Sequence, residues 1–442
     1  MIAVLVIAGV ASLAAFAGLH WYAWRRLVRD TTVRAGLARR AGTAVFVLGP
    51  LLMFAAVASE RAGAPFWLQQ VLSWPGFLWM AFSIYLVLAV LVGEVVRPLL
   101  RRYLDRRSAP GGAEPGPVPG PVPGPVPGPV PEPVLVPTRE PDELPTVTTA
   151  STPTPTAPEP VTPSAAADPS RRLFVSRVVG GAAAVAATGI VGNGAYGVLR
   201  GPRVKRVTVP LARLPRSAHG FRIAVVSDIH LGPVLGRGFA QRVVDTINST
   251  QPDLIAVVGD LVDGSVEDLA PAVAPLAGLR ARHGTYFVTG NHEYFSGAEP
   301  WVEHVREIGL RPLENARVEM GAFDLAGVND VTGENYGDGP DYDKALGDRD
   351  PGRAAVLLAH QPVMIHEAVK HGVDLQLSGH THGGQLWPGN FIADAANPTL
   401  AGLERYGDTQ LYVSRGAGAW GPPVRVGAPS DITVVELASK RA

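Results

Sequence analysis

Apolar and polar positions follow two different patterns along the 442 residues of the chain. Residues 2–17, 42–58 and 76–93 are almost continuously apolar or small, and each run approaches the roughly 20 residues that a helix needs to cross a bilayer. A fourth run, rich in Gly and Ala, covers residues 178–199. Beyond it, short apolar runs rich in β-branched residues alternate with amphipathic stretches. The pattern predicts an α-helical transmembrane region, rather than buried core helices, followed by an α/β domain.

The placement of arginine predicts how the membrane region is oriented. Residues 1–107 hold 12 arginines and 4 acidic residues, and the arginines gather after the first and third apolar runs. Because Lys and Arg concentrate on the cytoplasmic side, we expect the N-terminus outside the cell and residue 107 in the cytoplasm. A fourth crossing by residues 178–199 then places the rest of the chain outside. Basic residues after that run oppose this orientation locally, so a cytoplasmic domain without a fourth crossing is the alternative; they are Arg200, Arg203, Lys205 and Arg206.

Residues 108–170 have the composition of a spacer. They contain 20 of the 41 prolines, and 7 acidic residues against one arginine. Proline at this density favours extended polyproline II, and the Gly-Pro-Val-Pro period of four excludes a collagen triple helix. We expect a disordered linker here rather than a recognition segment. Immediately after it, Arg171-Arg172 followed by Phe174 and a weakly apolar run resembles a twin-arginine export signal.

These patterns divide the chain into four segments. We expect a membrane anchor with three transmembrane helices at 1–107, a Pro-rich disordered linker at 108–170, a twin-arginine-like segment with a fourth apolar helix at 171–200, and an α/β domain at 201–442. The last segment is long enough for one sizeable core. Its expected strands cover residues 223–227, 254–258, 286–289, 325–328, 355–358, 375–377, 411–414 and 432–437. Its expected helices cover residues 239–248, 269–279, 301–308 and 363–369.

The amino-acid composition excludes several types of catalytic and binding site. The chain has no cysteine, which excludes a thiol nucleophile, disulfides and thiolate metal or iron–sulfur sites. Residues 171–442 hold 26 basic and 28 acidic groups without a basic stripe or an aromatic ladder, so we expect no nucleic-acid partner. Any metal centre must therefore use nitrogen and oxygen ligands.

Polar side chains follow five of the expected strands. The motifs are Asp228-Ile229-His230, Gly259-Asp260, Gly290-Asn291-His292-Glu293, Ala359-His360 and Gly379-His380-Thr381-His382. Open α/β sheets bind ligands beyond the carboxyl ends of their strands, so these side chains should converge. Carboxylate, amide and imidazole groups suit Mn, Fe or Zn, and two ions ~3.5–4 Å apart need a shared carboxylate with separate ligands on either side.

Residues 222–437 resemble the calcineurin-like metallophosphoesterase superfamily, and residues 357–362 and 379–385 resemble its bacterial, membrane-associated phosphohydrolase branch. The resemblance implies a four-layer α/β/β/α sandwich and two divalent metal ions. It further implies that one ion is held by Asp228, His230 and His382, the other by Asn291, His360 and His380, and that Asp260 bridges them. His292 matches the catalytic histidine that binds no metal, and a metal-bridging hydroxide is the implied nucleophile.

One departure narrows the expected activity. In the protein Ser/Thr phosphatases of this superfamily Asp-Arg-Gly follows the bridging aspartate, whereas here Asp260 is followed by Leu261-Val262-Asp263-Gly264. We therefore expect a multi-pass cell-membrane phosphohydrolase with its metallophosphoesterase catalytic domain outside the cytoplasm. Its expected partners are the lipid bilayer and a phosphate-ester substrate, such as an envelope or lipid phosphate ester. The alternative is a membrane-coupled ligand-binding or sensor module on the same fold, with little turnover.

Two further segments have simpler interpretations. Residues 416–421 fit a dinucleotide-binding fingerprint literally, but Pro422-Pro423 follow where a helix is required. We expect a turn that lines or supports the site. Residues 330–350 are rich in Asp but lack the ligand spacing of a calcium-binding helix-loop-helix, so we expect a solvated acidic insertion near the cleft.

Overall fold

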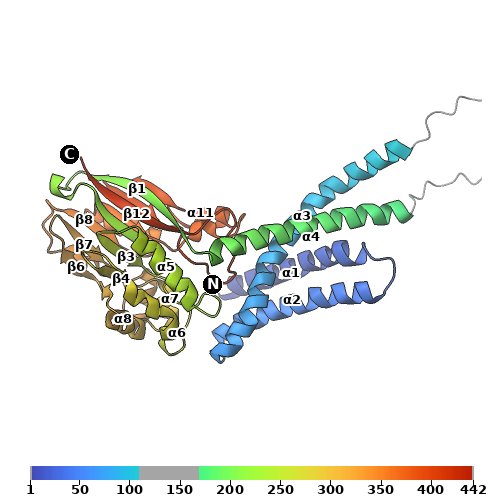
Figure 1. Cartoon of the computed structure of the whole chain (residues 1–442), viewed down its shortest axis with the longest axis horizontal. Helices are drawn as coiled ribbons and strands as arrows, with labels where there is room; N and C mark the ends of the chain where they lie inside the picture. Colours follow the sequence, from blue (N-terminus) through green and yellow to red (C-terminus); the bar gives the residue numbers. More distant parts are fainter. Residues whose placement is uncertain (1, 109–168, 441–442) are drawn as a thin grey trace, which may run out of the picture.

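The computed structural model describes residues 2–108 and 169–440. The linker predicted at residues 108–170 therefore lies almost entirely outside the described residues, and its predicted disorder stays a prediction. The described chain forms a bundle of long helices and an α/β domain at one end of that bundle (Figure 1).

The predicted apolar runs all lie within long helices. These helices are α1 (Ile2–Trp24), α2 (Leu37–Arg61), α3 (Phe66–Ser108) and α4 (Pro169–Leu199). In the part of the chain that the structure describes, α2, α3 and α4 are long and apolar enough to cross a membrane by length and composition. Helices α2 and α3 approach closely because a small residue of one faces a large residue of the other. The ring of Trp79 packs so closely on Gly49 that any side chain at position 49 would overlap it.

The two ends of the helical bundle differ in their neighbours and in their content of arginine. The N-terminus, the α2–α3 connection and the end of α4 lie beside the α/β domain, whereas the α1–α2 connection, the end of α3 and the start of α4 lie at the far end (Figure 1). The far end contains the arginine-rich segments, and there Arg26 Nη2 donates to Glu94 Oε2 over 2.7 Å. The four helices therefore run in alternating directions between the two ends of the bundle (Figure 1).

The α/β domain contains two six-stranded sheets. The first has the order β1 (Arg203–Leu211), β12 (Asp431–Ser439), β2 (Phe221–Val226), β3 (Leu254–Val258), β4 (Thr285–Val288) and β5 (Arg311–Pro312). The second has the order β10 (Gly402–Tyr406), β11 (Thr409–Val413), β9 (Leu375–Ser378), β8 (Ala354–Leu358), β7 (Phe323–Gly327) and β6 (Ala316–Glu319). The β2–β3–β4 and β7–β8–β9–β11 segments are parallel, so their carboxyl ends lie at common edges.

Helices cover the outer face of each sheet. Helices α5 (Arg237–Ser249), α6 (Val266–Val273) and α8 (Ala298–Glu307) pack on the first sheet, and α9 (Tyr342–Leu346) and α10 (Ile365–Lys370) pack on the second. A third apolar cluster, which includes Val225, Leu254 and Val356, fills the space between the sheets. The central strands β3 and β8 are buried on both faces and apolar throughout. This is the predicted four-layer α/β/β/α sandwich.

The eight predicted strands all occur, and β3 matches its predicted residues 254–258. The prediction missed β1, β5, β6 and β10. The second predicted helix, at residues 269–279, is instead α6 followed by a 3₁₀ segment at Ala274–Gly278. Pro271 and Pro275 remove the backbone donors that a continuous helix would need there.

Candidate metal centre

The loops at the ends of five strands bring all the predicted site residues together. Asp228 and His230 follow β2, Asp260 follows β3, and Asn291 and His292 begin the short helix α7 (Asn291–Ser296) after β4. From the second sheet, His360 follows β8, and His380 and His382 follow β9. The site therefore forms where the carboxyl ends of the two sheets meet, as expected for open α/β sheets.

Asp228, His230 and His382 form the first group of ligand-type side chains. One potential ligand atom from each lies within 4.8 Å of the other two, and all three residues are buried. His230 Nε2 is 3.0 Å from His382 Nε2, and His382 Nε2 is 3.4 Å from Asp228 Oδ1. Burial lowers the pKa of His382 well below its usual range, with His230 and Arg425 contributing further. The ring is therefore neutral, which is the form that binds metals.

The second group consists of Asp260, His360 and His380, with ligand atoms again within 4.8 Å of one another. His360 Nε2 is 3.1 Å from Asp260 Oδ2, and His380 Nδ1 is 3.0 Å from Asn291 Oδ1. Asp260 Oδ2 is also 3.8 Å from His230 Nε2 of the first group. Asp260 thus lies between the two groups, in the position of a shared ligand.

A buried nitrogen indicates that these residues fit a cation. His360 Nδ1 donates to Val258 O over 2.9 Å, while its buried Nε2 lies 3.1 Å from Asp260 Oδ2 without the alignment of a hydrogen bond. Buried polar atoms are normally hydrogen-bonded, so an imidazole nitrogen and a carboxylate oxygen that are this close but poorly aligned with each other are unusual. The donor set is imidazole, carboxylate and amide, which suits a divalent cation such as Mn, Fe or Zn.

Asp263, which the sequence reasoning left without a role, contacts two histidines of the site. His230 Nδ1 donates to Asp263 Oδ1 over 2.9 Å, and His292 Nδ1 lies 2.6 Å from the same oxygen. Burial lowers the pKa of His292, but the hydrogen bond and charge of Asp263 outweigh this and raise it to about 9. The only available signal was position, because Asp263 lies in the loop of Asp260.

Arg425 is a second residue that the sequence reasoning missed. Its Nη2 donates to His382 Nδ1 over 3.0 Å, and its Nη1 donates to His382 O over 3.0 Å. Since Nδ1 accepts, the proton of neutral His382 is on Nε2, which then donates to His230 Nε2. A continuous chain of hydrogen bonds thus connects four side chains in the order Asp263, His230, His382 and Arg425. If His382 held a cation through Nε2, the proton would have to leave that nitrogen.

Glu293 holds the backbone around Asp260. Its carboxylate accepts from Asp260 N over 2.9 Å, Leu261 N over 2.7 Å and Gly290 N over 2.6 Å. Burial raises the pKa of Glu293 to about 7, helped by the Asp260 charge and opposed by these backbone donors. The glutamate therefore ties the β3 loop to the β4 loop.

Backbone strain is concentrated at the site. Five non-glycine site residues have positive φ, namely Asp228 at 51°, His230 at 49°, Asp260 at 54°, His380 at 74° and His382 at 53°. This left-handed region costs energy for residues with a Cβ, and it persists where surrounding contacts hold it. One such contact is the turn at residues 416–418, where Ala417 N and Gly418 N donate to Ser227 O and Asp228 O over 2.9 Å and 2.8 Å. The segment is a supporting turn, as predicted.

Exposed aromatic side chains flank the site. The ring centroid of His292 is 5.4 Å from that of Phe295 and 5.6 Å from that of Trp420, and both aromatic residues are exposed. Farther along, the short helix α11 (Asn390–Ala396) exposes Phe391 and Ile392 and buries no residue. These four side chains and Trp387, which is also exposed, are called the apolar rim below.

The apolar rim lies on the side of the domain that faces the bundle. Helix α11 occupies that side in Figure 1, and Tyr85 Oη on α3 donates to Trp387 O over 2.9 Å. Phe66, at the start of α3, packs against the core of the first sheet. Glu60, at the end of α2, interacts electrostatically with Asp263 and His292. The site is therefore next to the apolar helices.

The acidic segment at residues 330–350 is only partly solvated. Most of its acidic side chains are exposed, but Asp330 is fully buried, and its Oδ1 accepts from Gln361 Nε2 over 2.9 Å. Asp338 instead accepts from Tyr294 Oη over 3.0 Å. The segment is thus attached to the domain at both points, beside the loop that carries His360.

Comparison with known proteins identifies the family. The family profile described as calcineurin-like phosphoesterase matches residues 221–384. An uncharacterized metallophosphoesterase of Helicobacter pylori strain J99 is 37% identical over 275 residues, covering 62% of this chain and 74% of that protein. The uncharacterized metallophosphoesterase YkuE of Bacillus subtilis is 30% identical over 287 residues, covering 61% and 98%. A transmembrane protein with metallophosphoesterase domain from Bos taurus is 41% identical over 253 residues, covering 53% and 57%. The chain therefore belongs to the calcineurin-like metallophosphoesterase family, whose bacterial members include close matches to it, and is a hydrolase of phosphoric ester bonds.

Proposed function

We propose that the protein is a membrane-anchored phosphohydrolase that uses two divalent cations and cleaves phosphate esters presented at a membrane surface. The observation that supports two cations is the position of Asp260 between two groups of ligand-type side chains. The observation that supports a membrane-borne substrate is the apolar rim between the site and the helical bundle.

Asp228, His230 and His382 would hold one cation, and Asn291, His360 and His380 would hold the other, with Asp260 shared. Bound there, divalent cations would polarise the phosphoryl oxygens and activate a water molecule. The nitrogen and oxygen ligands suit Mn, Fe and Zn alike.

His292 and Asp260 are the proposed catalytic residues, the second also as a ligand. His292 Nδ1 lies against Asp263, which leaves Nε2 for the substrate. From there the imidazole can stabilise negative charge on the phosphoryl group and give a proton to the leaving oxygen. Asp263 holds the ring in this orientation, in the same way that a carboxylate orients a catalytic or metal-binding histidine elsewhere.

A phosphodiester or phosphomonoester on a lipid or another envelope component is the proposed substrate class. The loop after Asp260 contains no arginine, and this departs from the protein Ser/Thr phosphatases. Hydrophobic residues exposed beside a site mark surfaces that meet apolar partners. An ester held in a bilayer would reach the site along the apolar rim.

The bundle also supports a multi-pass protein with its α/β domain outside the cytoplasm. Its arginine-rich segments lie at the end opposite the domain (Figure 1), and this is the end that the positive-inside bias assigns to the cytoplasm. The chain lacks cysteine, so single cysteines can report the orientation. We expect Asp408→Cys in the domain to react with a membrane-impermeant maleimide on intact cells, and Arg34→Cys to react only after lysis. The reverse pattern would contradict this orientation.

Activity itself is tested on the purified full-length protein with bis(para-nitrophenyl) phosphate and added manganese. Asp260→Asn and His292→Gln should each reduce turnover at least about a hundredfold. His366→Gln removes an exposed histidine on α10 and should leave turnover unchanged. Wild-type protein that retains manganese but does not turn over any ester in a phosphate-ester screen would instead favour a sensor or ligand-binding module on this fold.

A further inference from the structure

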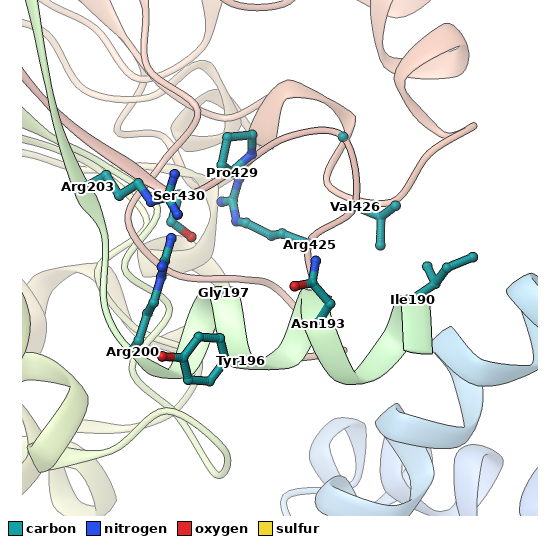
Figure 2. A pocket seen from close by; sticks show the side chains of 11 residues that line it. Ile190, Asn193, Tyr196, Gly197, Arg200, Arg203, Arg425, Val426, Pro429 and Ser430 are labelled. Atoms are coloured by element: carbon teal, nitrogen blue, oxygen red, sulfur yellow. The ribbon is translucent and has the colours of Figure 1, made fainter. Parts of the chain in front are cut away.

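A pocket of about 370 Å³ lies between the last turns of α4 and the loop before β12 (Figure 2). This volume is within the range of about 300–1,000 Å³ that small-molecule pockets have. Its lining comes from two segments more than two hundred residues apart. They contribute Ile190, Asn193, Tyr196, Gly197, Arg200 and Arg203 on one side, and Arg425, Val426, Gly427, Pro429 and Ser430 on the other.

The pocket is strongly cationic. Three arginines and no carboxylate line it. Arg200 and Arg203 are exposed, and across residues 2–108 and 169–440 neither forms a salt bridge. Arg425 is buried, held by Gly418 O and His382. Arg200 and Arg203 can therefore offer charge-assisted hydrogen bonds to an anion, whereas the guanidinium of Arg425 already donates to protein acceptors.

A buried hydroxyl in the same pocket lacks a partner. Ser430 is 5% exposed, and its Oγ has no hydrogen-bond partner. Leaving a buried polar group unpaired costs about 1–3 kcal/mol, so a ligand that accepts a hydrogen bond from this hydroxyl would be stabilised. An oxyanion held by the arginines would provide one. The unpaired serine and the arginines are independent observations that indicate the same ligand chemistry.

The two ends of the pocket differ in polarity. Ile190 and Val426 lie toward the helical bundle, whereas Arg200, Arg203 and Ser430 lie toward the α/β domain (Figure 2). A ligand that fills both ends carries a phosphate at one end and an apolar group at the other. Inorganic phosphate would leave the apolar end uncovered.

The pocket occupies the level at which lipid headgroups are expected. Helix α4 is long and apolar enough to cross a membrane from Arg171 to Leu199, and the pocket extends from Ile190 past the end of the helix to Arg203. These arginines are the same ones that oppose the positive-inside orientation. Binding of an anionic headgroup explains them, because juxtamembrane basic residues are attracted to anionic lipid by about 1 kcal/mol each.

We propose that this pocket binds the phosphate of an anionic phospholipid, with Arg200, Arg203 and Ser430 as its contacts. The pocket lining includes no proposed metal ligand, and the proposal rests on the proposed membrane anchoring but not on ester hydrolysis. Arg425 lines the pocket and donates to His382 Nδ1. A bound headgroup would therefore also stabilise the position of one proposed metal ligand.

The test measures lipid binding by the full-length protein in detergent, using native mass spectrometry with palmitoyl-oleoyl phosphatidylglycerol. The Arg200→Gln/Arg203→Gln double variant should bind about twenty-fivefold more weakly, since each arginine is expected to contribute about fivefold. Ser430→Ala should weaken binding about fivefold, and its fold should be intact because the hydroxyl has no partner to lose. Arg206→Gln is the matched control, since Arg206 belongs to the same basic segment but does not line the pocket.

Each outcome decides the proposal. Loss of binding in the double variant and in Ser430→Ala, with Arg206→Gln unchanged, supports it. Unchanged binding in the double variant overturns it, and so does an equal loss in Arg206→Gln, which would mean general surface charge. Glycerol 3-phosphate or inorganic phosphate that displaces the lipid at equal concentration would overturn the lipid assignment and identify a soluble phosphate as the ligand.

Discussion

The helical bundle and the α/β domain distribute their apolar side chains in opposite ways. In the bundle, large apolar residues are exposed, with Leu37 and Val185 at 83% and 73%. In the α/β domain the central strands are wholly buried, as in β3, and exposed apolar residues include the apolar rim that faces the bundle. Exposed apolar area of this extent needs a lipid or protein cover. The comparison therefore supports the proposal that one apolar environment covers both the bundle and the apolar rim.

The largest expected effect concerns the polar centre of the α/β domain. Removing divalent cations from the full-length protein with EDTA should reduce ester hydrolysis at least about a thousandfold, because the carboxylate and imidazole groups cannot replace the cationic charge. Manganese added afterwards should restore it, as measured with bis(para-nitrophenyl) phosphate. Full activity in protein shown by elemental analysis to be free of metal would contradict a metal-dependent centre.

A smaller effect is expected at the residue that orients two histidines. Asp263→Asn removes the charge that holds His230 and His292, so kcat should fall about tenfold to a hundredfold and metal affinity should fall by a similar factor. Kinetics and metal titration measure the two effects. Glu267→Gln, an exposed acidic residue on α6, is the matched control. Normal metal affinity and normal kcat in Asp263→Asn would show that the hydrogen bonds are incidental.

The apolar rim tests the link between the two regions. Phe391→Ser/Ile392→Ser should reduce hydrolysis of a vesicle-borne phosphodiester about tenfold, since less apolar surface would contact the membrane. Hydrolysis of the soluble nitrophenyl ester should not change. Val363→Ser/Val369→Ser removes exposed apolar residues elsewhere on the domain and should affect neither substrate. An equal loss on both substrates would mean that the rim supports the fold and not membrane access.

The smallest effect is expected where the two regions are hydrogen-bonded. Tyr85→Phe removes the bond to Trp387 O, which should cost about 1 kcal/mol and lower Tm by about 2–4 °C. Tyr336→Phe, an exposed tyrosine of the domain, is the control. Thermal unfolding of the two variants side by side measures the difference. An unchanged Tm in Tyr85→Phe would show that packing alone holds the domain against α3.

The strands in the interior of the two sheets were predicted from the sequence, whereas several edge strands were missed. The five motifs lie at strand ends, as predicted, because the strands before them end in buried and mostly apolar residues, as in β3 and β8. Strand β1 was missed because it lies at the edge of its sheet, where Lys205 and Arg206 interrupt the apolar pattern. The short edge strands β5, β6 and β10 lack a distinctive pattern for the same reason.

The residues that support the ligands were not predictable in the same way. Asp263 was visible only as a departure from a known motif, and Arg425 is 43 positions from the histidine that it contacts. Glu293 was seen within its motif, but its three backbone contacts depend on how the β3 and β4 loops approach each other. Such contacts have no periodic signal, since they depend on tertiary geometry and not on local conformation.

By itself, the sequence determined the kinds of ligand available, the order of the strands that carry them and the apolar helices that precede them. These features depend on local periodicity and side-chain chemistry, which the chain shows directly. Only the tertiary structure decided that Asp263 and Arg425 hold their histidines, and that α4 meets the loop at residues 425–430 around a cationic pocket. These arrangements join segments far apart in the chain, and only the packing of the two sheets and the bundle brings them into contact.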